Sequence, residues 1–228
     1  MKRTIYRGVG SILLALASLA VVNTDSFAQS APNQISPQFV AYIQTEPHVK
    51  ALLDAIRERL SKTPGACQTG KFERDPTLAF ILPIKYDAQG TPIEGAWKES
   101  INYIGCDSKT RFNLMTVISP DMGVKVAALL SGTTIATPRL QADSIMYAFM
   151  GTALLARGCK EKTVIDTHFD SYTGDAVKDA LNGPDSRPWH ETWTVWACNQ
   201  TIDVPISFTP DNRGTGIHSS PSEATLHH

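Results

Sequence analysis

Two stretches, WKESINYIGC at residues 97–106 and WHETWTVWAC at residues 189–198, decide the fold predicted for this chain. In each stretch a tryptophan stands two residues before a glutamate and nine residues before a cysteine. A further cysteine lies 39 residues before the last cysteine of each stretch. Matched residue types at equal spacing indicate one module written twice. The four cysteines are Cys67, Cys106, Cys159 and Cys198.

A helical pattern precedes the first cysteine of each copy. In the first copy Thr45 is a suitable N-cap and Pro47 lies in the first turn, with apolar residues following at i, i+3, i+4 and i+7. In the second copy Thr137 caps the helix, Pro138 takes its first position, and an apolar face continues until Gly158. One helix is therefore expected at the start of each copy.

Strands are predicted between and after the cysteines of each copy. A first hairpin turns near residues 87–90, and its second strand carries the W-x-E segment. Bulky apolar groups on both faces of that strand suit a central position, whereas Pro205 suggests that the strand after Cys198 lies at an edge. We expect an α+β fold of two duplicated modules, each one helix and three antiparallel strands, related by a pseudo-twofold.

This hairpin predicts the disulfide pairing. A cysteine lies at each open end of the hairpin, and cross-strand partners are about 5 Å apart, within disulfide reach. The favoured pairs are Cys67 with Cys106 and Cys159 with Cys198. The alternatives are bridges between the copies and zinc bound by four thiolates, but no C-x-x-C spacing is present, so no metal is expected.

The first 28 residues have the pattern of a cleaved signal peptide. Lys2, Arg3 and Arg7 give a basic start, residues 9–22 are mostly apolar, and residues 26–28 read Ser-Phe-Ala. The apolar run is too short to span a bilayer, which needs about 20 residues. We therefore expect an exported protein, periplasmic or extracellular, with no transmembrane segment in the mature chain.

The remaining chain divides by composition and by the repeat. The first module is expected at residues 29–121, a connecting segment at 122–136 and the second module at 137–211. Residues 212–228 are polar and rich in Ser, Gly and Pro, so a disordered tail is expected there, and His227 and His228 are read as part of it.

Charge argues against a nucleic-acid partner. Residues 1–28 carry three basic side chains and one acidic one, which leaves 18 basic against 21 acidic, a net charge of about −3. The lysines and arginines are scattered rather than clustered, as counterion release from phosphates would require. No Gly-rich phosphate loop precedes a helix, and no cofactor is expected.

Two groups of residues are candidates for catalysis. Asp166, His168 and Asp170 alternate, so on a strand they share one face and form a possible acid-base cluster, although a solvated polar face explains the pattern equally. Glu99 and Glu191 are equivalent in the two copies, and a pseudo-twofold would bring them together as paired carboxylates. The ordinary alternative is that each pairs with a neighbouring cation.

Trp97 and Trp189 are the candidate binding residues. Exposed tryptophans recognise carbohydrates and protein partners, and a groove between copies would present both. Buried aromatic residues also dominate protein cores, so burial in the core is the competing interpretation.

The second copy resembles a group of uncharacterised exported proteins of Gram-negative bacteria. The resemblance covers residues 131–211 and rests on Gly132-Thr133-Thr134, the segment 140–143 and the run from Trp193 through Cys198 to Pro210-Asp211. Asn199 departs from it, since glycine is expected after the cysteine. The resemblance implies export and the cysteine pattern but no activity.

Together these features predict an exported, disulfide-stabilised binding or structural protein without catalytic activity, with an unknown partner that is a protein or a glycan. One alternative is a hydrolase of envelope polymers that uses the carboxylates named above. Another is an inhibitor or immunity-type protein that blocks a partner enzyme.

Overall fold

The computed structural model describes residues 35–177 and 187–227. The predicted signal peptide lies outside these residues. Residues 36–228 form one compact unit. Within the described ranges no helix is long and apolar enough to span a membrane.

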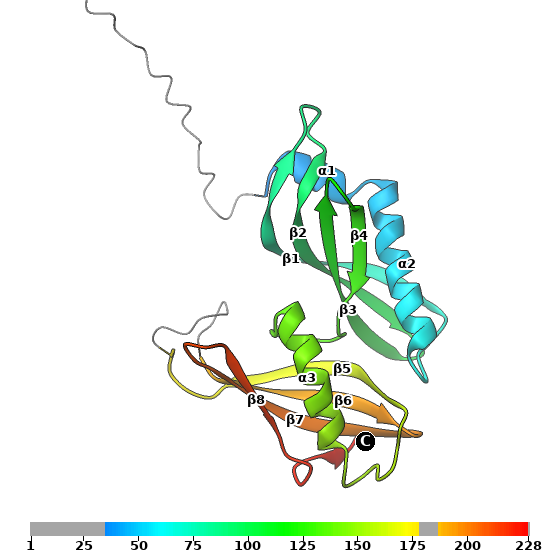
Figure 1. The fold of residues 1–228 in the computed structure, drawn as a ribbon. Helices are drawn as coiled ribbons and strands as arrows, with labels where there is room; N and C mark the ends of the chain where they lie inside the picture. The colour runs from blue at the N-terminus through cyan, green and yellow to red at the C-terminus, as the bar shows by residue number, and fades with distance from the viewer. Residues whose placement is uncertain (1–34, 178–186, 228) are drawn as a thin grey trace, which may run out of the picture. The chain divides into compact units, whose positions relative to one another are not determined.

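The first module is an antiparallel sheet with strand order β1-β2-β3-β4, preceded by two helices. The longer helix lies along β3 and β4 (Figure 1). Its buried residues recur every four positions, as an amphipathic helix requires. The elements are α1 (Pro37–Ile43), α2 (Glu46–Lys62), β1 (Gly70–Tyr86), β2 (Pro92–Gly105), β3 (Ser108–Ser119) and β4 (Gly123–Ala128).

The second module repeats this plan. One helix packs on an antiparallel sheet of order β5-β6-β7-β8, and a short further strand pairs with β7 (Figure 1). The elements are α3 (Pro138–Gly151), β5 (Lys162–Tyr172), β6 (Trp189–Ala197), β7 (Gln200–Pro210), β8 (Thr215–Ser219) and β9 (Thr225–Leu226).

The predicted α+β class, the two similar modules and one disulfide in each are confirmed. Each module has at least four strands rather than three. β4 extends the first module beyond the expected boundary at residue 121, because its main chain pairs with β3. The tail expected to be disordered supplies β8 and β9, which pair with β7, so that prediction was wrong.

Two further expectations need correction. α3 ends at Gly151 rather than Gly158, and the Thr152 hydroxyl then donates to the Phe149 carbonyl at the helix end. β7 is not an edge strand, because β6 lies on one side and β8 and β9 on the other. Pro205 fits there because β8 pairs from residue 206 and β9 only with residues 202–203, so the described strands leave a gap beside it.

The second cysteine of each pair occupies a two-residue hairpin turn. Cys106 and Asp107 have φ of 47° and 58°, and Cys198 and Asn199 have φ of 48° and 68°. Such a turn requires the left-handed conformation at both positions. Among residues other than glycine, Asp and Asn adopt this conformation most readily. The turn expected to need glycine at residue 199 therefore forms with asparagine.

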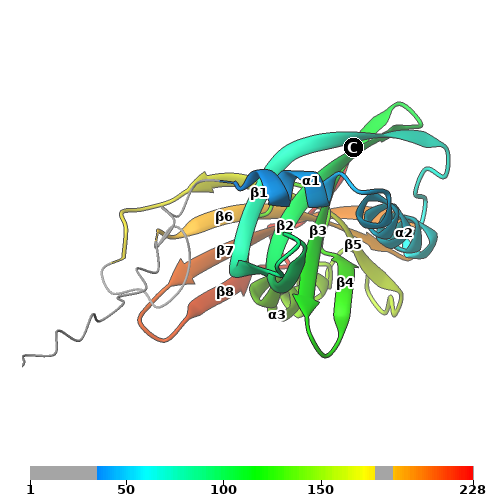
Figure 2. The ribbon, with the colours of Figure 1, turned by 90° about the horizontal axis from the view of Figure 1, so that it is seen from above.

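α1 completes the first core. Phe39 is fully buried and makes edge-to-face contacts with Phe80 and Trp97, with ring centroids 5.0 Å apart in both pairs. Figure 2 shows α1 lying over β1 and β2. The β1–β2 hairpin turns at residues 87–91, as predicted, where the Asp87 carboxylate accepts two backbone N–H groups.

The connecting segment bonds to a strand of each module. The Gly132 N–H donates to the Arg111 carbonyl of β3 at 2.8 Å, and the Thr133 N–H donates to the Thr167 carbonyl of β5 at 2.7 Å. Gly132 has φ of 101°, and a Cβ there would lie 1.9 Å from the Thr167 oxygen. Only glycine fits this crossing without displacing β5.

Candidate functional site

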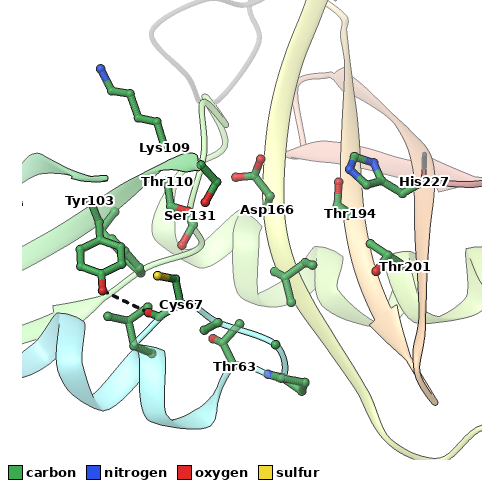
Figure 3. A pocket seen from close by; sticks show the side chains of 17 residues that line it. Thr63, Cys67, Tyr103, Lys109, Thr110, Ser131, Asp166, Thr194, Thr201 and His227 are labelled. Carbon is green, nitrogen blue, oxygen red and sulfur yellow. Dashed lines mark hydrogen bonds between the residues drawn. The ribbon is translucent and has the colours of Figure 1, made fainter. Parts of the chain in front are cut away.

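A cavity of about 380 Å³ lies where side chains of the two modules meet (Figure 3). Its volume falls within the range of ligand pockets, about 300–1,000 Å³. The first module contributes the end of α2, the loop after it and the β2–β3 turn region, and the second contributes β5, β6, β7 and residue 227. The cavity is therefore built from segments far apart in the sequence.

The first module supplies an apolar wall. Leu60, Tyr103 and Phe112 line the cavity and are each at least nine-tenths buried. The Tyr103 hydroxyl donates to the Cys67 carbonyl at 3.1 Å, which ties the sheet to the disulfide loop. This wall is fixed by core packing and a covalent bridge, so it does not depend on a ligand for its shape.

Hydroxyl groups make up much of the remaining lining. Ser131 is only 3% exposed, yet its hydroxyl has no hydrogen-bond partner among the described residues, while its carbonyl accepts from the Thr167 hydroxyl at 2.5 Å. Thr110 and Thr201 also line the cavity with hydroxyls unpartnered in the described part of the chain. These three hydroxyls reach the cavity, so each is available to a ligand or to water.

An aspartate and a histidine are paired beside the cavity. Asp203 Oδ1 accepts from the Thr194 hydroxyl at 2.7 Å, and Asp203 Oδ2 lies 2.8 Å from His227 Nδ1. The His227 N–H also donates to the Thr201 carbonyl at 2.8 Å. Since Nδ1 and the backbone are both held, the ring has a defined place, and its Nε2 has no partner within the described ranges.

Asp166 is the carboxylate on the cavity lining. Asp166 is exposed as a residue, but partial desolvation of its carboxylate raises its pKa, while a hydrogen bond from the Thr167 N–H and the nearby His168 and His227 act in the opposite direction. No lysine or arginine of the described residues forms an ion pair with it. Lys109 lines the cavity edge but directs its amine away (Figure 3).

The three alternating candidate residues on β5 lie in different surroundings. Asp166, His168 and Asp170 are all exposed and Thr167 between them is buried, but only Asp166 lines the cavity. His168 Nε2 lies 3.9 Å from Asp170 Oδ1, and the Thr192 hydroxyl donates to Asp170 at 2.9 Å. Within residues 35–177 and 187–227, no group of three His, Cys, Asp or Glu side chains is arranged to hold a metal ion.

Glu99 and Glu191 lie in separate parts of the core. Glu99 Oε1 accepts from Trp97 Nε1 at 2.9 Å and lies 2.8 Å from His48 Nε2. Both carboxylates are more than nine-tenths buried. The structure does not bring them together as a pair around a cleft, and each accepts hydrogen bonds from its own module.

Glu191 accepts three hydrogen bonds. Its Oε1 accepts from Trp189 Nε1 at 2.9 Å and from the Ile135 N–H at 3.0 Å, and its Oε2 accepts from Trp193 Nε1 at 2.7 Å. The W-x-E pattern thus places an indole N–H two residues from a buried acceptor on the same strand face. Because a buried N–H needs a partner, the motif stabilises the core.

The candidate binding tryptophans are also core residues. Trp97 is fully buried, and Trp189 is 5% exposed and stacks on Phe208 with ring centroids 4.6 Å apart. Neither indole presents a surface to a ligand, which favours the core interpretation of the sequence.

Sequence reasoning missed His227, Asp203, Thr194, Thr201 and Ser131. The sequence places His227 in a polar tail, and its partner Asp203 lies 24 residues away. The available signal was Thr194 and Asp203, two polar residues that pair directly across the polar face of the β6–β7 hairpin.

Comparison of the chain with protein-family models, with curated proteins and with solved structures finds no match.

Proposed function

We propose that this chain is an exported, non-catalytic binding protein that holds a small polar ligand in the cavity between its two modules. The observation that carries the proposal is the polar lining, in which the hydroxyls of Thr110, Ser131 and Thr201 reach the cavity and make no hydrogen bond to the described residues. A polar ligand that enters the cavity can hydrogen-bond to these hydroxyls in place of water. The disulfide-stabilised wall on the opposite side supports a preformed site.

Export is supported by two features. Residues 1–28 have the signal-peptide pattern, and both disulfides suit an oxidising compartment. Periplasm and medium are both compatible with these features.

Binding is favoured over hydrolysis by the carboxylates. Glu99 and Glu191 are each occupied by donors of their own core, and they have no common cleft in the described part of the chain. The Asp203–His227 pair lies at the cavity, and no nucleophile of the described residues hydrogen-bonds to the histidine. A general base needs such a contact with the group that it activates.

The test is a ligand-observed NMR screen of the mature, oxidised protein against sugars, amino acids, dipeptides and nucleosides. A Thr201→Phe variant fills the cavity from β7, and a Thr209→Phe variant adds the same ring at an exposed position of the same strand. We expect at least one class of compound to bind the parent and the Thr209 variant but not the Thr201 variant. Binding that survives Thr201→Phe, or no binding by any class, would contradict the proposal.

A further inference from the structure

We propose that the cavity selects a sugar that carries a protonated amine, an amino sugar. This inference rests on the proposed binding function and specifies its ligand class. Three features support it: the charge of the second-module wall, the unpartnered hydroxyls and the apolar surface of the lining.

The charge at the cavity favours a cation. Asp166 lies on the lining and Asp203 lies behind it, paired with the His227 ring. Lys109 directs its amine away from the cavity (Figure 3). A second anion would meet repulsion here, whereas an ammonium group would complete an ion pair with Asp166.

Asp166 is held ready for such a partner. Its carboxylate accepts from the Thr167 N–H, and Gly132 runs so close that a Cβ there would lie 2.6 Å from Oδ1. Because the neighbouring backbone displaces water from one side, the ionised carboxylate lacks part of its hydration. The ammonium group of a ligand would supply the hydrogen bonds and positive charge that replace this lost hydration.

The hydroxyl groups favour a ligand with several donors and acceptors. Thr110, Ser131 and Thr201 each bring a hydroxyl that both donates and accepts, and His227 Nε2 adds a fourth polar atom. A simple amine would pair with Asp166 and leave these groups unsatisfied. A sugar ring carries adjacent hydroxyls that satisfy several of them at once.

The apolar surface of the lining fits the remaining face of a sugar. A pyranose presents C–H groups on its ring faces, and the half-buried Pro64, Ala66 and Ile165 of the lining offer apolar surface to them. At about 380 Å³ the cavity is near the small end of ligand pockets, which indicates one or two rings rather than an enclosed polymer.

Calorimetric titration with four probes tests the inference: glucosamine, glucose, N-acetylglucosamine and ethylamine. We expect glucosamine to bind the parent about tenfold more tightly than glucose, since hydrogen bonds to charged groups are stronger than neutral ones. N-acetylglucosamine lacks the charge and should bind like glucose. Ethylamine lacks the ring and should bind more weakly than all three sugars.

Two matched variants locate the effect. Asp166→Asn should remove the preference for glucosamine over glucose, whereas Asp170→Asn, four residues along the same strand and outside the cavity, should preserve it. Ser131→Ala should weaken glucosamine and glucose by a similar factor of several-fold and leave their ratio unchanged. Circular dichroism of each variant verifies that it is folded.

Several outcomes would overturn the inference. Equal binding of glucosamine and glucose, equal effects of the two aspartate variants, or ethylamine binding as tightly as glucosamine would each do so. If none of the sugars binds but another compound class is blocked by Thr201→Phe, the inference fails and the proposed binding function stands. If nothing is blocked by that variant, both fail.

Discussion

The two buried glutamates predict a specific asymmetry between the modules. In Glu191 both carboxylate oxygens accept hydrogen bonds, whereas in Glu99 the indole of Trp97 and the ring of His48 meet the same oxygen, Oε1. Glutamine keeps one acceptor oxygen and replaces the other with an N–H₂ group. Glu99→Gln therefore retains both hydrogen bonds, while Glu191→Gln places a donor against a donor in a fully buried site.

The magnitudes follow from the hydrogen bonds that each variant breaks. Glu191→Gln loses a charge-assisted hydrogen bond and leaves a buried indole N–H unpaired, a cost of about 3 kcal/mol. Glu99→Gln loses charge without losing a partner, a cost of about 1 kcal/mol. With a urea dependence of about 2 kcal/mol per molar, the midpoints fall by about 1.5 M and 0.5 M respectively.

Urea unfolding of the oxidised protein, followed by tryptophan fluorescence and by hydrogen exchange, measures both effects. The Trp193 indole N–H donates to the Glu191 oxygen that glutamine replaces, so it should exchange faster in Glu191→Gln but not in Glu99→Gln. Exposed Glu161→Gln serves as the control for a charge change alone. Equal midpoints for the two buried variants, or a larger loss for Glu99→Gln, would refute this account of the W-x-E motif.

Three further predictions concern the connection, the bridges and the cavity. Gly132→Ala should lower the melting temperature far more than Gly123→Ala. Both glycines have positive φ, but only at Gly132 would the new Cβ collide with backbone atoms. Similar melting temperatures for the two variants would contradict this. Removing either disulfide by serine substitution should cost about 4 kcal/mol on the loop-entropy scale, and the two losses should match because the loops are equal, as non-reducing thermal unfolding would reveal. Partial desolvation raises the pKa of Asp166, so the folded chain holds more protons than the unfolded chain just above the ordinary carboxyl pKa, and stability falls as pH rises through that window. Asp166→Asn should therefore melt at a higher temperature than the parent at neutral pH, with the difference vanishing in acid; an unchanged melting temperature at every pH would be evidence against it.

The modules were predictable because their signals are local or repeated. The caps at Thr45 and Thr137, the turn near residue 87 and the 39-residue spacing each involve few residues, and their repetition made them mutually supporting. The central position of the W-x-E strands also followed from bulky residues on both faces, and β2 and β6 are central.

The cavity was not predictable because it depends on partners distant in sequence. In the sequence Ser131 lies in a connecting segment. Its place at the cavity depends on the hydrogen bonds of that segment to β3 and β5. The sequence places His227 in a polar tail. The pairing of β9 with β7 brings it to Asp203. One of the three donors to Glu191, the Ile135 N–H, likewise comes from the connecting segment, which the repeat alone does not reveal.

The pairing of neighbouring cysteines affects how the protein matures. Each bridge joins cysteines that follow one another along the chain, Cys67 with Cys106 and then Cys159 with Cys198. A chain that enters an oxidising compartment from its N-terminus presents the first pair before the third cysteine arrives. Simple oxidation in order of appearance then yields the native bridges, and slow reshuffling of mispaired intermediates becomes unnecessary. If the chain is exported as we propose, this pairing of consecutive cysteines requires no disulfide isomerisation.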